Sequence, residues 1–483
     1  MNNSNIANDD FVHQITSALG NPPDLTIQYF HFSSDLIGCC IFIKTITDKE
    51  KIENFIIRPL IEAPSLKTEH PEQIIQAVNH VISAIPVVKE SDFATCLQSL
   101  LGGNVILFVP PNKEVLLIDV YKYSNRAITE SQSEPTIRGP HESFIENIES
   151  NISLVRKRLK TPHLRLEQMT LGDSTQTQII SAYLENVAPP EVVNEFRSRL
   201  GSIKTDSILE SAYVEEWIQD KTFSPFPTIY NTDRPDVVTA HLLEGRVCVF
   251  FEGAPNVLIG PCTFFQFFIA AEDYYQRADV ATVIRWLRIF SFLLSVLLPS
   301  LFVGIVSYHQ ELLPTPLLIS FAAQREGVPF PAFVEALVLL ITLEILREAG
   351  LRMPRIAGQA ISFVGAIVLG EAAVQAGLVS GSMVIVVAIT AISNFVIPAY
   401  SLGISQRLIQ FFLLLLSGIM GFFGLLCGTL FIMTHLVTLK SFGIPYLAPI
   451  APSILADWKD TLVRVPRPFN TLPKIMKPRR KDR

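Results

Sequence analysis

The stretch that decides the fold of the first half is CIFIKTITDKEKIENFIIRPL, residues 40–60, because its pattern recurs without a gap as ISAYLENVAPPEVVNEFRSRL, residues 180–200. Each copy opens with an apolar run typical of a strand, residues 40–45 and residues 180–185. Apolar residues then recur every four positions, as on one face of a helix: Ile52, Ile56 and Leu60 in the first copy, and Val192, Phe196 and Leu200 in the second. Both copies therefore predict a strand followed by an amphipathic helix.

A second pair of similar stretches lies at nearly the same offset. Residues 100–108 match residues 242–250, and each run leads through a turn with Pro or Gly into a short apolar return, residues 115–120 and residues 257–259. Such runs are typical of hairpins. We predict two α/β subdomains of common ancestry, near residues 22–122 and 163–262; the alternative is a chance alignment of two amphipathic patterns.

A polar linker, residues 123–141, and an amphipathic helix separate the two repeats. The helix is predicted by one apolar stripe, which consists of Phe144, Ile148, Ile152, Val155 and Leu159. Its last turns are basic, with Arg156, Lys157, Arg158 and Lys160. Two interpretations stay open for this cluster: contact with acidic lipid or another subunit, or an ordinary solvated helix end.

Charge divides the chain into a soluble half and a membrane half. Residues 1–288 have a net charge of −12, residues 289–456 contain six acids and six bases, and residues 457–483 have a net charge of +6. The acidic first half disfavours nucleic-acid binding. The six cysteines form no CxxC pair, which argues against a zinc site or a disulfide framework. No phosphate loop, GxSxG or HExxH motif is present, so we expect no enzyme, no cofactor and no metal.

Five apolar stretches of the second half are long enough to be membrane spans. They are residues 289–308, 330–346, 356–379, 383–402 and 408–437. Arg285 and Arg288 before the first stretch place its start on the cytoplasmic side. The N-terminus lacks a secretory signal, so we expect a cytoplasmic N-terminal half. A cytoplasmic tail then requires an even number of crossings, so either the short apolar piece at residues 317–323 adds a crossing or one of the five stretches does not fully span the membrane.

Small and ionisable residues mark two kinds of helix contact. Glycines 421, 424 and 428 align along the fifth stretch and predict close helix packing, within one subunit or between subunits. Carboxylates inside spans are costly and are therefore functional candidates. Glu344 has Arg347 nearby and is expected to form a structural ion pair. Glu335 and Glu371 are expected either to line an ion path or to make a packing contact. Gln375 lies one turn after Glu371.

Several longer strings show a family resemblance. They are Arg138-Gly139-Pro140, Ser224-Pro225-Phe226-Pro227, Arg234-Pro235-Asp236, residues 243–247 (LEGRV), His309-Gln310-Glu311, residues 328–331 (VPFP), residues 346–350 (LREAG), residues 372–376 (AAVQA) and Ser441-Phe442-Gly443. Over nearly its whole length the chain resembles the A subunits of bacterial spore germinant receptors, the GerA family. The proline-containing strings are also ordinary turn signals.

The resemblance implies a multipass protein of the spore inner membrane that acts with a transporter-like B subunit and a lipoprotein C subunit. It also implies an A-subunit ring that forms an ion channel and starts germination when nutrients are sensed. Family members commonly carry Gln where Glu371 stands and a small residue where Asn394 stands. Candidate ion-path or gating residues are Glu335, Glu371, Gln375 and Asn394, and candidate coupling or packing residues are His309, Gln310, Glu311, Glu344 and Arg347.

The predicted fold class is therefore α/β followed by a polytopic α-helical membrane domain. The predicted parts are an α/β subdomain (1–122), a linker with its amphipathic helix (123–162), a second α/β subdomain (163–284), a transmembrane helical domain of four to six segments (285–440) and a basic cytoplasmic tail (441–483). Two other functions stay open. A secondary transporter would need paired broken helices in the membrane half, and a membrane-anchored scaffold would have no use for carboxylates in its spans.

Overall fold

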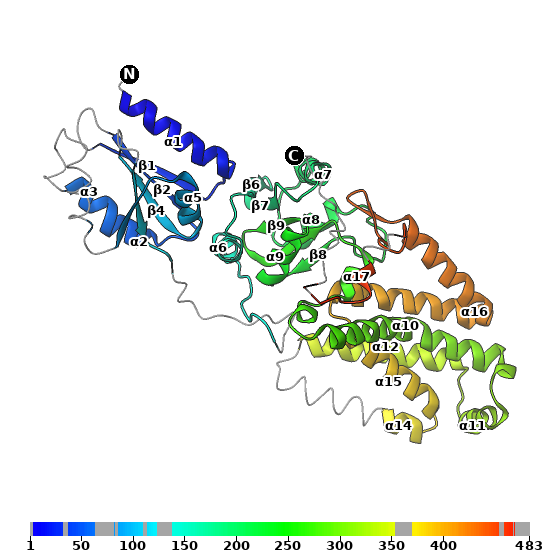
Figure 1. The fold of residues 1–483 in the computed structure, drawn as a ribbon. Helices are drawn as coiled ribbons and strands as arrows, with labels where there is room; N and C mark the ends of the chain where they lie inside the picture. Colours follow the sequence, from blue (N-terminus) through cyan, green and yellow to red (C-terminus); the bar gives the residue numbers. More distant parts are fainter. Residues whose placement is uncertain are drawn as a thin grey trace. The chain divides into compact units, whose positions relative to one another are not determined.

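The computed structural model describes residues 3–31, 37–62, 82, 86–109, 114–122, 138–352, 370–453, 458–466 and 468 (Figure 1). The chain forms two compact units. The sheet unit contains residues 1–219 and 229–261, and the helical unit contains residues 220–228 and 262–473. Residues 123–137 of the predicted linker, most of the predicted span at 356–379 and the end of the predicted tail lie outside the described residues.

The sheet unit contains two five-stranded antiparallel sheets with the same strand order. The first sheet has the order β1-β2-β4-β5-β3 and the second has the order β6-β7-β9-β10-β8. The elements of the first repeat are α1 (Asn3–Leu19), β1 (Leu25–His31), β2 (Ile37–Ile43), α2 (Lys49–Lys51), the π-helix η1 (Ile52–Ile57), α3 (Arg58–Glu62), β3 (Val87–Glu90), α5 (Phe93–Leu101), β4 (Asn104–Phe108) and β5 (Val115–Asp119).

After α6 (Ile148–Arg158), the second repeat follows the same plan. Its elements are β6 (Leu164–Leu171), β7 (Thr177–Leu184), α7 (Pro190–Gly201), α8 (Ser211–Ile218), β8 (Tyr230–Thr232), α9 (Pro235–Leu243), β9 (Val247–Phe251) and β10 (Ala254–Gly260). The shared strand order agrees with the repeat found in the sequence. The predicted strand-to-helix units are present in both copies, and the six apolar helix residues named for them are all buried.

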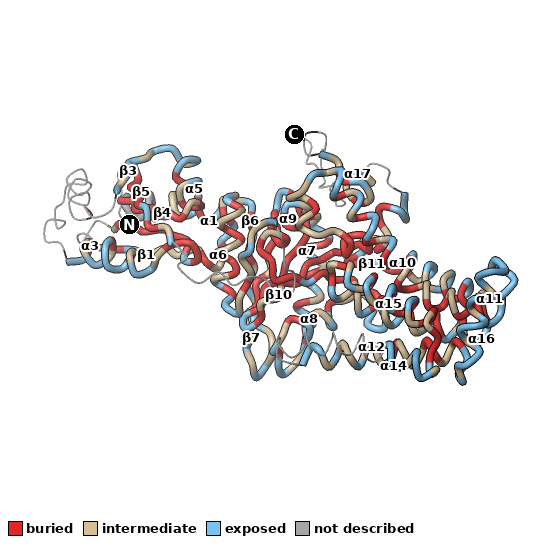
Figure 2. Tube along the Cα trace, turned by 90° about the horizontal axis from the view of Figure 1, so that it is seen from below, coloured by how far each residue is buried: buried red, intermediate tan, exposed pale blue. Residues whose placement is uncertain are grey.

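Helices cover both faces of the first sheet because its central strands are apolar on both faces. Successive side chains of a strand point to opposite faces. Cys40 and Phe42 of β2 pack toward the helical segment 52–60, whereas Cys39, Ile41 and Ile43 pack toward α1 and α5. In Figure 2 the buried residues of this unit accordingly follow the strands.

Helix α6 is attached to the first repeat by a buried ion pair. All five residues of its predicted apolar stripe are buried, as expected. Arg156 donates from Nε to Asp24 Oδ2 at 2.6 Å and from Nη2 to Asp24 Oδ1 at 2.8 Å. Both side chains are buried, so neither open interpretation of the basic cluster fits Arg156. Arg158 pairs with Glu142 within the same unit. The sequence pattern missed this pairing because the two partners are 132 residues apart.

The described part of the helical unit contains four longer helices and several short elements. They are η3 (Phe264–Phe268), η4 (Ala271–Tyr274), α10 (Ala278–Tyr308), η5 (Gln310–Leu312), α11 (Thr315–Arg325), α12 (Ala332–Arg352), α14 (Gly370–Gln375), α15 (Gly381–Phe395), α16 (Tyr400–Thr438), β11 (Lys440–Ser441), β12 (Ile444–Pro445) and α17 (Trp458–Thr461). Among the described residues, α10 and α16 are the two helices whose length and composition suffice for crossing a membrane.

Helix α16 is a hairpin of two antiparallel helices (Figure 1). Gly421 at the turn has φ 62° and ψ −144°, which is not helical. The rings of Phe412 and Phe431 lie 6.2 Å apart, although a straight helix would separate them by about 28 Å. The prediction of one span over residues 408–437 is therefore wrong. A glycine inside an apolar run looks like a packing site in the sequence, but Gly421 reverses the chain.

The other two glycines of this stretch close the hairpin within one chain. A side chain at Gly428 would meet Leu413 and Leu416, and one at Gly424 would meet the Leu416 carbonyl. The sequence left open whether these glycines pack within one subunit or between subunits. For Gly424 and Gly428 the structure shows packing within one subunit.

Candidate functional site

Glu335 is the most buried of the predicted site residues, with 1% of its surface exposed. It lies in the first turn of α12 and reaches the start of α15, where Ser380 is the N-cap. The backbone N–H and the hydroxyl of Ser380 both donate to Glu335 Oε2, at 3.0 and 2.8 Å. Arg325 Nη2 lies 3.5 Å from the other carboxylate oxygen. A carboxylate at a helix N-terminus is electrostatically favourable, so Glu335 fastens α11, α12 and α15 together.

A second cluster connects α12 to α16. Glu344 accepts a hydrogen bond from Arg347 at 2.8 Å and one from Arg407 at 2.9 Å. The Arg347 guanidinium also lies over the ring of Phe395, 5.7 Å from its centre. The pairing of Glu344 with Arg347 follows the expectation, and Arg407 was missed because it lies 63 residues away along the chain. The cluster carries one net positive charge.

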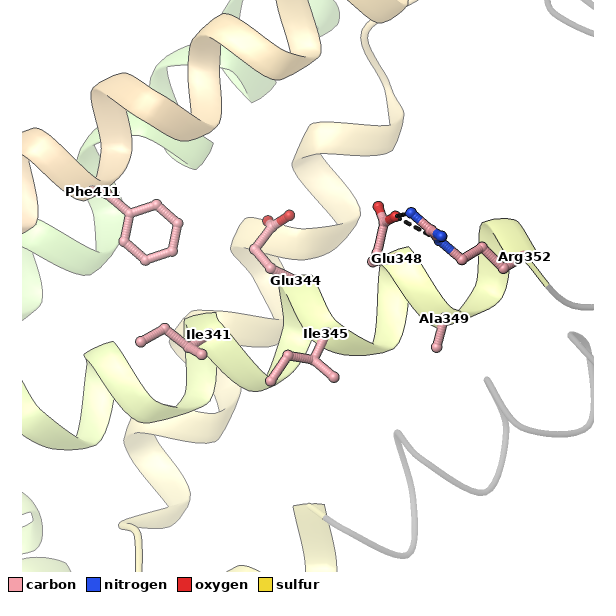
Figure 3. Close-up of a pocket in the computed structure, with 7 residues that line it drawn as sticks. All are labelled: Ile341, Glu344, Ile345, Glu348, Ala349, Arg352 and Phe411. Carbon is pink, nitrogen blue, oxygen red and sulfur yellow. Dashed lines mark hydrogen bonds and ion pairs between the residues drawn. The ribbon is translucent and has the colours of Figure 1, made fainter.

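A groove of about 580 Å³ runs along α12 beside this cluster (Figure 3). It is lined by Ile341, Glu344, Ile345, Glu348, Ala349, Arg352 and Phe411. In Figure 3, Glu348 turns along the helix toward Arg352 and pairs with it. Since this pair is exposed, only the Glu344 end of the groove carries a partly buried charge.

The other predicted ion-path residues lie apart from Glu335. Gln375 donates to Glu371 at 3.1 Å on α14, so the expected i,i+4 pair is present, and both side chains are exposed. Asn394 lies half-buried in the last turn of α15, where its carbonyl accepts the Val396 and Ile397 amides. These residues do not converge with Glu335 on one site within the described chain.

His309, Gln310 and Glu311 form the turn that follows α10. Gln310 bonds back to the Val306 carbonyl at 2.8 Å, and the His309 ring packs edge-on against Phe422. The hydroxyl of Tyr308 donates to the Gly418 carbonyl at 2.6 Å. The end of α10 and the turn of the α16 hairpin therefore lie together, and we call this part of the helical unit the distal end.

The opposite, basal end contains a buried charge cluster that sequence reasoning missed. Arg288 donates to Asp273 Oδ1 at 2.8 Å, and Arg285 donates to Asp273 Oδ2 at 3.3 Å. Arg285 is completely buried, and its guanidinium also donates to the Asp460 carbonyl. Arg464 binds the carbonyls of Gln276 and Tyr274. The two arginines were interpreted as cytoplasmic flanking charges; in the structure both bind Asp273, and Arg285 also holds the segment after α16 against the start of α10.

Two of the family strings meet at this basal end. Ser441 donates to the Thr228 carbonyl at 2.6 Å, and Tyr446 donates to the Pro227 carbonyl at 2.7 Å. Phe226 stacks on His435, near the end of α16. Phe442 and Gly443 both have positive φ, as a tight two-residue hairpin turn requires. The SPFP and SFG strings thus form one docking contact, and the described part of the predicted tail is folded onto the helical unit.

Three further strings stabilise turns of the sheet unit. Arg234 is buried, pairs with Asp236 at 2.7 Å and donates to the Pro140 carbonyl, which joins RPD to RGP. In LEGRV, Gly245 has φ 92° and a Cβ there would lie 2.9 Å from the Val187 carbonyl oxygen. Burial alone would raise the pKa of Glu244, but hydrogen bonds from His241 and the charge of Arg246 outweigh it and hold this pKa at about 2.

Comparison with known proteins places these features in a family. The model of the Bacillus/Clostridium GerA spore germination protein matches residues 13–475, which include both repeats and the helical unit. The chain belongs to the GerA family. The resemblance drawn from the motifs is therefore confirmed.

Named relatives extend over most of the chain. It is 44% identical to spore germination protein KA of Bacillus subtilis over 426 residues, which cover 88% of this chain and 78% of that protein. It is 41% identical to the uncharacterized membrane protein YfkQ of Bacillus subtilis, over 92% of this chain and 86% of the relative. For the spore germination protein GerLA of Bacillus cereus the identity is 36%, over 95% and 93% of the two chains.

A solved structure also matches. It is the crystal structure of the N-terminal domain of the A subunit of the Bacillus megaterium spore germinant receptor GerK3, with 33% identity and a TM-score of 0.42. The match covers 52% of this chain and 94% of that domain.

Proposed function

We propose that this GerA-family chain is a multipass subunit of a nutrient-responsive germination receptor in the spore inner membrane. Its sheet unit lies in the cytoplasm, and it acts with a transporter-like B subunit and a lipoprotein C subunit. Several copies form an ion channel that opens when nutrients are sensed. The single observation that carries this proposal is a helical unit that buries the carboxylate of Glu335 among apolar helices, within a chain of this family.

The hairpin of α16 supports a membrane placement because it makes the number of proposed membrane crossings even. We count as crossings the four earlier predicted spans, one of which lies mostly outside the described residues, and the two halves of the hairpin; six is an even number, as a common side for both ends of the chain requires. The distal contacts agree with this arrangement, because α10 ends where the hairpin turns. A relative that covers 92% of the chain is named a membrane protein.

The exposure of Glu371 supports an assembly of several copies. Within the described part of the chain it is hydrogen-bonded to the neutral amide of Gln375, and both side chains are exposed. In a bilayer a lipid-facing carboxylate costs several kcal/mol, so it fits better against a water-filled lumen or another copy. Ring formation around a lumen would supply either environment.

Two other functions stay as alternatives. A secondary transporter would move the solute itself, and its paired broken helices have no counterpart among the described helices, since the break in α16 is a hairpin turn. A membrane-anchored scaffold would leave the buried carboxylate of Glu335 without a purpose beyond packing.

The test is ion conductance of the purified protein in liposomes, alone and with its B and C partners. Glu371→Gln and Glu335→Ala are compared with Glu348→Gln, a matched control whose carboxylate is paired at the exposed end of the groove. Nutrient-dependent current with ion selectivity changed by Glu371→Gln supports a channel. Solute uptake without current would favour the transporter. If every reconstitution gave neither current nor solute uptake, and deletion of the protein still abolished germination, the scaffold would be the remaining function.

A further inference from the structure

Uncharged polar side chains form a continuous seam between α10 and the first half of the α16 hairpin. The seam consists of Ser291, Ser295 and Ser300 on α10 and Ser405, Gln406, Gln410 and Ser417 on α16, and every one of them is buried. Two contacts fix the register of the helices. Gln406 donates its amide to the Ser295 hydroxyl, and the Ser417 hydroxyl donates to the Ser300 carbonyl at 2.6 Å.

Three seam atoms have no hydrogen-bond partner among the described residues. They are Gln406 Oε1, Gln410 Nε2 and Ser300 Oγ. Gln406 is completely buried and Gln410 is 4% exposed. Since Gln406 and Gln410 are four residues apart, their amides lie on the same face of α16, one turn apart.

Pro299 adds a further acceptor to the same seam. It lies inside α10 and has no N–H, so the helix cannot provide the usual hydrogen bond to the Ser295 carbonyl. The Ser295 side chain is already in the seam. Polar groups of the seam therefore extend along α10 from residue 295 to residue 300, which is about 7.5 Å of helix.

Buried polar groups of this kind are normally satisfied by water. A buried amide or hydroxyl without a hydrogen bond is strongly unfavourable, and internal waters typically bind two to four such groups. An apolar pair of helices would need none of these residues. We propose that the α10–α16 seam holds a file of water that forms a polar path through a single subunit.

The proposed path is separate from the Glu335 cluster and carries no charged side chain. Neutral amide, hydroxyl and carbonyl oxygens can replace part of the hydration of a monovalent cation without binding it tightly, as conduction requires. The inference rests on the proposed membrane placement, since water in the seam matters for permeation only if both helices cross the bilayer.

The test is the accessibility of single introduced cysteines to Ag⁺, a monovalent cation that reacts with thiols. The full-length protein in proteoliposomes carries Ser295→Cys, Ser300→Cys or Gln410→Cys. After exposure to Ag⁺, the protein is unfolded and alkylated, and each thiol is read by peptide mass spectrometry. Ser300→Cys changes little in shape and removes no hydrogen bond made by its hydroxyl, so it is the variant that folds most securely.

The controls lie on the outer face of the same hairpin. They are Leu408→Cys and Leu415→Cys, whose leucines are 58% and 51% exposed, and the native Cys427, which is also exposed. We expect Ag⁺ to react with the seam thiols at least tenfold faster than with the control thiols. Adding Gln410→Leu should slow the reaction of Ser300→Cys, because an apolar side chain blocks the file.

If neither the seam cysteines nor the lipid-facing controls react with Ag⁺, the seam proposal is overturned and the proposed receptor function is left intact. Controls that react as fast as the seam positions would show that the hairpin does not lie in lipid. That result would overturn both the membrane placement and the path.

Discussion

Removing the carboxylate of Asp24 should destabilise the sheet unit more than removal of any exposed charge in it. Asp24 accepts two hydrogen bonds from Arg156 and one from the Thr45 hydroxyl at 2.8 Å. Asp24→Ala leaves the Arg156 guanidinium buried without its counter-ion. Breaking a buried pair from one side costs about 3–5 kcal/mol, which reduces the folded-to-unfolded ratio by roughly two to four powers of ten.

A second ion pair provides the matched control. Lys44 and Glu149 also connect the first repeat to α6, but their side chains are 42% and 57% exposed. Exposed pairs contribute about 0–1 kcal/mol, so Lys44→Ala should change little. The double variant Asp24→Leu with Arg156→Met should recover most of the loss, because two apolar side chains of similar volume replace the pair without leaving a charge.

The assay is native-state hydrogen exchange of the amides in β1, β2 and α6, which reports the free energy of opening of this region alone. A whole-chain unfolding curve would mix the two compact units. If Asp24→Ala lowered the opening free energy by less than about 1 kcal/mol, no more than Lys44→Ala, the assignment of Arg156 to a buried tie would be refuted.

Three other predictions concern a turn, a titrating side chain and a motif. Gly424→Ala should destabilise the hairpin by about 1–3 kcal/mol because its Cβ would collide with the Leu416 carbonyl. The control Gly350→Ala should be neutral or slightly stabilising, because a Cβ at Gly350 would have no atom within 4 Å. Thermal unfolding in detergent measures both variants. Burial, with the charges of Glu210 and Glu216, raises the pKa of Glu215 to about 7. The stability that Glu215 contributes is thus fully present below its unfolded pKa of about 4.3 and is lost as the pH rises through 7, and Glu215→Gln should flatten this slope in unfolding measurements between pH 5 and pH 8. Arg246→Met should cost about 1–3 kcal/mol in urea unfolding because it removes the donor to the Pro261 carbonyl and the cationic partner of Glu244, and an unchanged midpoint would argue against that role.

The sequence predicted most of the local structure and little of the pairing between distant residues. The repeated strand and helix patterns were visible because period-two and period-four spacing survives when identities do not. Arg156 looked like one of several surface charges, since nothing in a local pattern shows a partner 132 residues away. The predicted domain boundaries remain predictions, although residues 220–228 and the described residues after 440 belong to the helical unit.

The candidate site was predicted unevenly for a related reason. Charges are rare in apolar segments, so Glu335 and Glu344 stood out and do have specific partners. Gln406, Gln410 and the serines of the seam carry no charge and do not break an apolar run, so composition did not reveal them. Their positions on facing helices become visible only when the hairpin at Gly421 places the first half of α16 beside α10.

The single-residue turn of α16 also bears on how the chain enters a membrane. Most helical hairpins must carry a polar loop across the hydrocarbon, and each buried polar group raises the barrier. Here the chain reverses at Gly421, between Met420 and Phe422, so the tip of the hairpin is apolar. In the proposed membrane placement, both halves can therefore partition into lipid together, and the second half of the hairpin needs no separate translocation step.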